Sequence, residues 1–242
     1  KYNNLKIIII DNSSTDNSYN KIKSWFKKND MSFGNKPNKN NLITLLKTNY
    51  NGGYAYGNNI AIRLALNYSD DPYIWILNND TIVDKQSLIS LINFYNDNKK
   101  QILGSKILYS DSSIIDSFGG KITKLFFSAL NNKTISDNYD YIPGTSIFFK
   151  KNIIDTIGYI PENYFMYYED VDWSTKALKN KIELKIVNES IVKHFKISNI
   201  SFYLRFYSFK NRLLFIFKNY PLFFPLQLFL LPIYILKKII FK

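Results

Sequence analysis

The sequence predicts an α/β domain built around a largely parallel sheet. Three short apolar runs, at residues 5–10, 42–46 and 73–77, are each followed by a segment with helical periodicity. Each run also ends at polar residues, and ligands bind beyond the carboxyl ends of the strands in sheets of this kind. We therefore expect the functional side chains to gather where these runs end.

The first part of the chain alternates strands with helices. The β-branched run at 5–10 is typical of a buried parallel strand, and Ile22, Trp25 and Phe26 recur at helical spacing behind it. Stretches rich in Asn, Lys, Gly and Pro predict loops. The expected elements are, in order, a strand at 5–10, a helix from residues 14–16, a loop at 29–41, a strand at 42–46, a glycine-rich turn at 49–53, a helix at 58–67, a strand at 73–77 and a helix at 85–95.

Beyond Gln101 this alternation gives way to short strands and turns. We expect strands at 102–109 and 147–149, and a turn at the glycine pair 119–120. No internal repeat is visible, and 242 residues suffice for one large domain with an appendage.

The composition excludes several kinds of site. There is no cysteine and only one histidine, His194. Disulfides, a thiolate nucleophile, Cys-based zinc or iron–sulfur centres and multi-histidine metal sites are therefore excluded.

The positive charge is concentrated at the end of the chain. The net charge is +13, and the residues from Lys193 onward hold nine basic side chains and no acid. Only three of the 32 basic residues are Arg, the residue that best reads bases and clamps phosphates, so we expect no nucleic-acid partner. The charge-free stretch 219–236 contains three prolines, which favours attachment to an anionic membrane surface. A membrane span and a packed or oligomeric contact are the alternatives.

Three acidic clusters follow expected strands or turns. Asp11 follows the first strand, where a helix cap is the common interpretation. Asp80 follows the third strand, where a carboxylate can hold Mg²⁺ or Mn²⁺ against a diphosphate or simply end the strand. Glu169, Asp170 and Asp172 can raise one another's pKa and supply a general base, or form an acidic helix start.

Taken in order, these motifs resemble the inverting nucleotide-sugar glycosyltransferases of family 2, and their rhamnosyltransferase-like branch in particular. The resemblance covers about residues 5–217. It implies a GT-A fold, a mostly parallel sheet flanked by helices. The motifs that carry the resemblance are IIIIDNSSTDNS (7–18), NYNGGYAYGNNIAI (49–62), WILNNDTIVD (75–84), IPGTSIFFKK (142–151) and the segment 160–195.

The resemblance also assigns roles to single residues. It implies that Asp170 is the catalytic base with Glu169 beside it, and that Asp80 and His194 bind the metal, Mg²⁺ or Mn²⁺. Relatives carry an Asp-X-Asp metal motif at this place, and here Asn78 stands where they have the first Asp. The residues expected at the nucleotide sugar are Asp11, Asn12, Ser14, Asn49, Gly53, Asn59, Asn78, Asn79 and Gly144.

By the same resemblance, Arg212, in the pair with Asn211, is expected to reach phosphate or lipid. Residues 1–195 are expected to form the catalytic domain and 196–242 a basic, aromatic helical tail that associates with membrane.

The implied activity is transfer of a rhamnose-like sugar from a nucleotide-diphosphate donor to a saccharide or lipid-linked acceptor, in cell-surface polysaccharide synthesis at the cytoplasmic face of the membrane. A non-catalytic membrane-surface module, an inactive transferase fragment and a nucleotidyltransferase are the alternatives. Relatives open with an earlier strand and helix, so we expect this chain to be a fragment whose sheet lacks a central strand.

Overall fold

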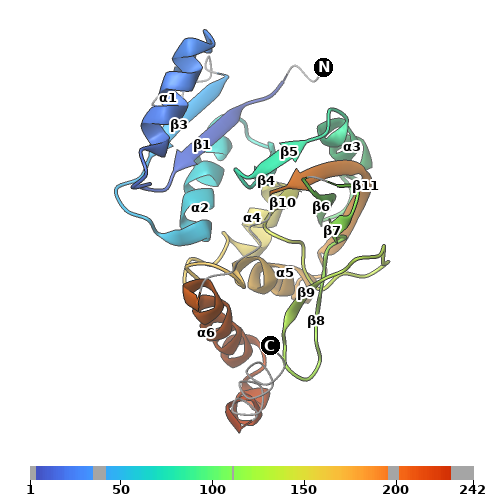
Figure 1. Cartoon of the computed structure of the whole chain (residues 1–242). Helices are drawn as coiled ribbons and strands as arrows, with labels where there is room; N and C mark the ends of the chain where they lie inside the picture. Colours follow the sequence, from blue (N-terminus) through green and yellow to red (C-terminus); the bar gives the residue numbers. More distant parts are fainter. Residues whose placement is uncertain (1–3, 35–41, 111, 196–201, 230–242) are drawn as a thin grey trace.

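The computed structural model describes residues 4–34, 42–110, 112–195 and 202–229 (Figure 1). A small parallel sheet has the strand order β1(Ile7–Asp11), β3(Ile43–Lys47), β2(Phe33–Gly34). Ile7 lies opposite Ile43 and Asp11 opposite Lys47. Helix α1(Ser18–Lys28) packs Phe26 on this sheet and leaves Trp25 exposed. The buried apolar face of this helix is therefore narrower than the sequence predicted.

The larger sheet has the order β4(Tyr73–Leu77), β10(Ser146–Lys150), β6(Gln101–Tyr109), β11(Glu183–His194), β5(Thr81–Val83), with β7(Ile115–Ser117) on β6. Only β6 and β11 pair in parallel; the other pairs are antiparallel. The prediction of a largely parallel sheet is therefore right for the small sheet and wrong for the large one. The reason is β10, which lies between β4 and β6 and runs antiparallel to both, so that these two parallel strands are not neighbours.

Helices cover both faces of the large sheet. On β10, Ile147 and Phe149 face one core cluster and Phe148 the other, as the two-residue period of a strand requires. The first cluster also contains Ile62 of α2(Gly53–Leu66) and Trp173 of α5(Glu169–Lys179). The remaining helices are α4(Lys151–Ile157) on the first face and α3(Ser87–Phe94) on the second.

The two sheets are not joined by strand pairing. Within the described residues, β1 pairs only with β3 and β4 pairs only with β10, so each has one edge without a neighbouring strand. Helix α2 contacts both β1 and β4 and thereby connects the two sheets.

Helix α6(Phe202–Asn219) packs on the domain beside the hairpin of β8(Gly120–Ile122) and β9(Ala129–Asn131) (Figure 1). Phe215 and Ile216 of α6 are buried in a cluster with Phe127, Tyr164 and Tyr168. The boundary predicted at residue 195 therefore separates two segments that pack together.

The 3₁₀ turn η1(Pro221–Phe223) follows α6. None of the described helices has the length and apolarity needed to cross a bilayer. Residues 230–236 of the charge-free stretch lie outside the described part of the chain.

Candidate active site

The turn after β4 carries the predicted metal ligand. Asp80 lies between β4 and β5, and its Oδ2 is 3.3 Å from Nε2 of His194. His194 ends β11 and lies opposite Thr81 of β5, so the pairing of these two strands holds the contact. The structure thus brings Asp80 and His194 together.

Asp116 is a third member of this group, and the sequence analysis missed it. Its side chain on β7 is 4% exposed, and its Oδ2 is 3.5 Å from Nδ1 of His194. His194 therefore stands between two carboxylates, one at each ring nitrogen. A carboxylate behind a metal-ligating histidine fixes the orientation and tautomer of the ring. No local motif marks Asp116, because only the pairing of β7 with β6 brings it to the end of β11.

Asp80 fits a hard divalent cation. Its Oδ1 is buried and has no hydrogen-bond partner among the described residues, so this oxygen is available to a ligand. No group of three or more His, Cys, Asp and Glu in the described chain is arranged to hold a metal. Mg²⁺ and Mn²⁺ need few protein ligands where phosphate and water oxygens complete the shell. The residues therefore fit Mg²⁺ or Mn²⁺ held jointly with a diphosphate.

The predicted catalytic acids begin α5. Both carboxylate oxygens of Asp170 accept backbone hydrogen bonds, Oδ2 from the N–H of Gly144 at 2.8 Å and Oδ1 from the N–H of Val171 at 2.8 Å. Glu169 is buried, and its Oε2 has no hydrogen-bond partner among the described residues. Asp170 is thus fixed in place, whereas Glu169 keeps one oxygen free.

The environment of Glu169 and Asp170 favours one proton on the pair near neutral pH. Burial, followed by the negative charge of Asp170, raises the pKa of Glu169 to about 8. Burial also raises the pKa of Asp170, but the N–H groups of Gly144 and Val171 oppose this rise because they stabilise the carboxylate. We infer that Glu169 holds the proton and that Asp170 is the ionised member of the pair.

Hydrogen bonds connect the acids to the metal loop. The N–H of Asn78 donates to the carbonyl of Thr145 at 3.2 Å, next to the Gly144 N–H that holds Asp170. The hydroxyl of Tyr54 donates to the carbonyl of Gly144. A Cβ on residue 144 would lie 2.9 Å from that hydroxyl, so the close approach needs glycine. The predicted metal and base residues therefore lie on adjoining loops.

The end of β1 offers a second unpaired acceptor. Asp11 is 4% exposed, and its Oδ1 accepts the N–H of Ser14 at 2.9 Å. Its Oδ2 is buried and has no hydrogen-bond partner among the described residues. Ser14 thus shapes the turn through its backbone, and Asp11 keeps one carboxylate oxygen for a donor such as a base N–H.

Asn12 and Gly53 hold loops of the protein itself. Nδ2 of Asn12 donates to the carbonyl of Gly53 at 2.8 Å and to Oδ1 of Asn51 at 3.1 Å. Gly53 has φ +87°, and a Cβ there would lie 2.1 Å from the carbonyl oxygen of Phe165. Glycine is therefore required by the neighbouring loop 160–168. Asn51 accepts the N–H of Gly53, which starts α2 five residues earlier than predicted.

Asn59 is a correction to the predicted nucleotide site. Its side chain is fully buried, donates to the carbonyl of Ile160 and to Oε1 of Glu162, and accepts the N–H of Ile160. All three contacts are internal, so this geometry does not support a contact with nucleotide. Asn49 and Asn79 are exposed.

The loop that carries the acids has a left-handed backbone and is held by α6. Tyr167 and Tyr168 have φ 70° and 74°, which is uncommon for non-glycine residues. Asn211 of α6 donates from Nδ2 to the carbonyls of Met166 at 2.7 Å and Tyr167 at 3.0 Å. Asn211 is therefore a positioning residue for the acids, a role that sequence reasoning missed.

Helix α6 also contacts the first turn of α5 directly. Asp172 accepts hydrogen bonds from Nζ of Lys218 and from Nδ2 of Asn219. Arg212 is 5% exposed, and its Nη1 donates to Oγ of Ser128 at 3.3 Å. The expectation that this guanidinium reaches phosphate or lipid is not met, because it faces the interior of the protein.

Comparisons with known proteins identify the family to which the chain belongs. The family model described as Glycosyl transferase family 2 matches residues 1–157. The chain is 23% identical over 185 residues to the Low-salt glycan biosynthesis hexosyltransferase Agl10 of Haloferax volcanii. That match covers 74% of this chain and 55% of the relative.

Two solved structures share the fold. GalNAc-T7 with UDP, GalNAc and Mn²⁺ has a TM-score of 0.62 at 14% identity, over 79% of this chain and 38% of that one. The mannosyltransferase PcManGT from Pyrobaculum calidifontis, in complex with GDP-Man and Mn²⁺, has a TM-score of 0.59 at 13% identity, over 92% and 59%. At these identities the structures establish the α/β, GT-A-like fold, and the chain spans less than two thirds of each of these proteins.

Proposed function

Because the chain belongs to glycosyl transferase family 2, we propose that it transfers a sugar from a nucleotide-diphosphate donor to an acceptor hydroxyl. The proposal rests on one observation: a candidate metal ligand and a candidate general base lie on adjoining loops. Asp80, beside His194, has a carboxylate oxygen without a hydrogen-bond partner among the described residues, and Asp170 is an oriented base two hydrogen bonds from Asn78. Direct displacement at a sugar carbon needs a metal site to stabilise the leaving diphosphate and a base to take the proton of the attacking hydroxyl.

The donor is assigned to the ends of β1 and β4. Asp11 would accept a hydrogen bond from the base through its Oδ2, and Asp80 and His194 would hold Mg²⁺ or Mn²⁺ near the diphosphate. When bound, the cation neutralises the charge that develops on the leaving diphosphate. Asp116 keeps the ring of His194 oriented toward Asp80.

Asp170 then acts as the general base. Its carboxylate takes the proton of the acceptor hydroxyl while that oxygen bonds to the anomeric carbon, and the bond from this carbon to the diphosphate breaks. One displacement inverts the configuration at that carbon. The N–H groups of Gly144 and Val171 keep Asp170 ionised and in place, and Glu169 stays protonated beside it.

The finer assignment is a rhamnose-like hexose transferred to a saccharide or lipid-linked acceptor of a cell-surface polysaccharide. The name of the Haloferax relative, a hexosyltransferase of glycan biosynthesis, supports a hexose and a glycan. The GDP-Man and UDP named in the two structures support a nucleotide-diphosphate donor.

We also propose that the enzyme attaches to the inner face of the membrane. Phe202, Tyr203 and Phe206 are exposed on α6, interleaved with Arg205 and Lys210. Such a mixture of aromatic and cationic side chains is typical of helices at an anionic lipid surface.

Calorimetric binding of dTDP, UDP and GDP, with and without Mn²⁺, tests the donor site. We expect Mn²⁺-dependent binding of one nucleotide class, abolished in Asp80→Ala and retained in Asp70→Ala, which removes an exposed acid remote from the site. Binding that survives in Asp80→Ala, or a folded protein that binds none of the three, contradicts the proposal.

A further inference from the structure

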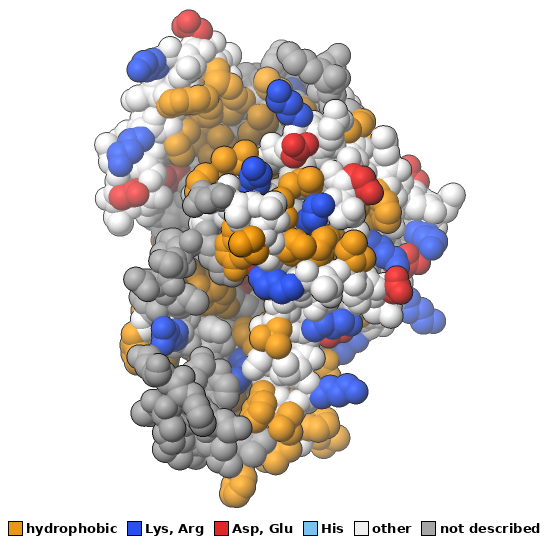
Figure 2. Space-filling model, turned by 45° about the vertical axis from the view of Figure 1, so that its right-hand side comes forward, with side chains coloured by type: hydrophobic (Ala, Val, Ile, Leu, Met, Phe, Trp, Pro, Cys, Tyr) orange, Lys and Arg blue, Asp and Glu red, His pale blue; other side chains and the backbone are white. Residues whose placement is uncertain are grey.

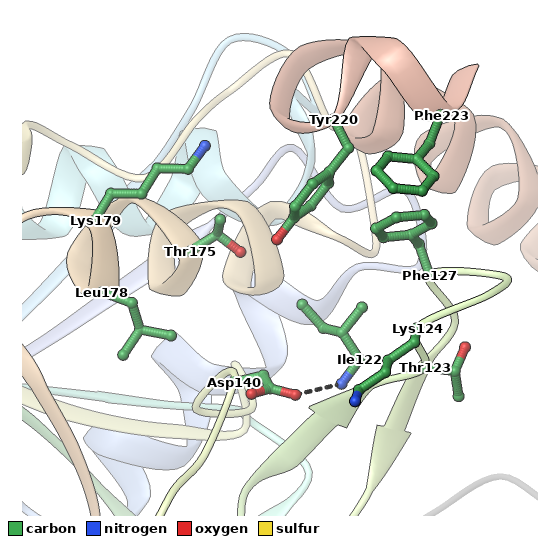
Figure 3. A pocket seen from close by; sticks show the side chains of 10 residues that line it. All are labelled: Ile122, Thr123, Lys124, Phe127, Asp140, Thr175, Leu178, Lys179, Tyr220 and Phe223. Atoms are coloured by element: carbon green, nitrogen blue, oxygen red, sulfur yellow. Dashed lines mark hydrogen bonds between the residues drawn. The ribbon is translucent and has the colours of Figure 1, made fainter. Parts of the chain in front are cut away.

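A cavity lies away from the proposed donor site, at the other end of α5. It has a volume of about 470 Å³ and lies between the second half of α5, the β8–β9 hairpin and η1 (Figure 3). Its apolar walls are formed by Ile122, Phe127, Leu178, Tyr220 and Phe223. Cavities of this size and composition are typical of sites for small ligands.

The walls of this cavity are held by contacts among themselves and with the segment after η1. The ring of Phe127 lies 4.7 Å from that of Tyr220 and 5.6 Å from that of Phe223. Gln227 is buried and donates from Nε2 to the carbonyl of Leu125 at 2.7 Å, which ties the segment after η1 to the hairpin turn. The cavity is therefore a formed feature of the folded domain.

Cationic side chains flank the apolar walls. Lys124 is exposed and has no ion pair with any other described residue. Lys179 lies beside the ring of Tyr220, and its Nζ donates a hydrogen bond to Oδ1 of Asn219 (Figure 3). Asp140, the acid at this site, accepts the N–H of Ile122 and pairs with Lys121. The charge left at the rim is positive, which is complementary to a phosphate.

The surface around the cavity is apolar as well. Leu125, Leu178, Leu222 and Phe223 are each between 42% and 91% exposed. Figure 2 shows hydrophobic side chains gathered at the lower end of the molecule, the end that the β8–β9 turn and the end of α6 form in Figure 1. Apolar surface of this extent marks an interaction site.

The cavity is also connected to the proposed catalytic acids. Phe127, whose ring forms its wall, accepts a hydrogen bond at its carbonyl from the hydroxyl of Tyr168, the residue before Glu169. Leu178 lies eight residues beyond Asp170 on α5, about 12 Å along the helix. The cavity and Asp170 therefore lie toward opposite ends of one helix, and the hydrogen bond from Tyr168 links the cavity wall to the acid loop.

We propose that this cavity binds the apolar chain of a lipid-phosphate acceptor, with the phosphate at Lys124 and Lys179. The proposal rests on the transferase function proposed above and names its acceptor class. A bilayer lipid would need only the exposed surface, whereas an apolar cavity with a cationic rim, linked to the acid loop by the hydrogen bond from Tyr168 to Phe127, suits one chain that carries its own phosphate and sugar.

Farnesyl phosphate is a soluble probe for this site, and farnesol and inorganic phosphate are its two halves. We expect calorimetric binding of farnesyl phosphate that is at least tenfold weaker in Leu178→Trp, which fills the cavity while keeping the surface apolar. Leu222→Gln, which removes a more exposed side chain outside the cavity, should change the affinity less than twofold. Lys124→Gln should weaken binding of farnesyl phosphate severalfold and leave farnesol unchanged.

Three further measurements decide the interpretation. Thermal unfolding must be equal in the variants, and the nucleotide found by calorimetry must bind equally well with farnesyl phosphate present. Competition between the two ligands would place the chain in the donor site and overturn the proposal. If Leu222→Gln weakens binding of both anionic phospholipid vesicles and farnesyl phosphate, and Leu178→Trp weakens neither, the surface contacts a bilayer instead and the proposal is overturned. Normal nucleotide binding without any farnesyl phosphate binding refutes the cavity proposal alone.

Discussion

The two halves of the proposed site are built in opposite ways. The metal half lies on strand ends, where Asp80 is 43% exposed and His194 is set by strand pairing. The base half lies on a left-handed turn, where Glu169 is buried and α6 holds the backbone from outside. The first half depends on local sequence and regular pairing, and the second on contacts between distant segments. The metal half should therefore tolerate changes that the base half does not.

The largest effect is expected for Asp170→Asn. The amide can accept only one of the two backbone hydrogen bonds and cannot take the acceptor proton, so the transfer rate should fall between about 100-fold and 10,000-fold. Donor binding with Mn²⁺ should stay within twofold of wild type, because the metal half is unchanged. Single-turnover kinetics and calorimetry measure the two quantities. An equal loss in donor affinity would show that the halves are not separable.

Glu169→Gln tests whether burial raises the pKa of Glu169, through the pH dependence of the free energy of unfolding. The pKa of Glu169 is raised from 4.5 to about 8, so folding favours the protonated acid and the wild-type protein loses stability as pH rises through that range. The glutamine does not titrate. The free energy of unfolding of Glu169→Gln, relative to that of the wild type, should therefore rise with pH by on the order of 5 kcal/mol and level off above pH 8.

Urea unfolding of both proteins between pH 4.5 and 9 measures this difference. Glu189→Gln, at an exposed position, is the control and should show no such rise. A pH-independent difference for Glu169→Gln would mean that Glu169 ionises freely in the folded protein.

Asn211→Ala tests the support that α6 gives to the acid loop. It leaves the carbonyls of Met166 and Tyr167 without their donor, which should cost about 2 kcal/mol of stability. Because the loop positions Asp170, kcat should fall while KM for the donor stays unchanged. Lys210→Ala, on the exposed side of the same helix, controls for helix effects. A rise in donor KM without a change in kcat would contradict a positioning role.

The same contrast explains what the sequence could predict. β4 occupies its predicted residues, and Asp11 and Asp80 lie at strand ends as the apolar runs indicate, because each feature is encoded within a few neighbouring residues. The antiparallel order of the large sheet was not predictable from periodicity, which carries no information on strand direction.

Asn59 shows the same limit for a single residue. Its motif implies a ligand contact, but its partners at Ile160 and Glu162 are about a hundred positions away and use all of its hydrogen-bonding groups internally. Asp116 and Asn211 were missed for the same reason, because their roles exist only once β7 has paired with β6 and α6 has packed on the acid loop.

Asp116→Asn should have the smallest effect and sharpens the description of the metal half. The amide keeps the size of the carboxylate but removes the charge behind His194, so Mn²⁺ affinity should fall about tenfold. Electron paramagnetic resonance of free Mn²⁺ in the presence of the nucleotide measures this, and Asp137→Asn, at an exposed site, is the control. An unchanged Mn²⁺ affinity would mean that the pairing of β11 with β5 alone orients His194, and that the metal half needs no support from outside its strands.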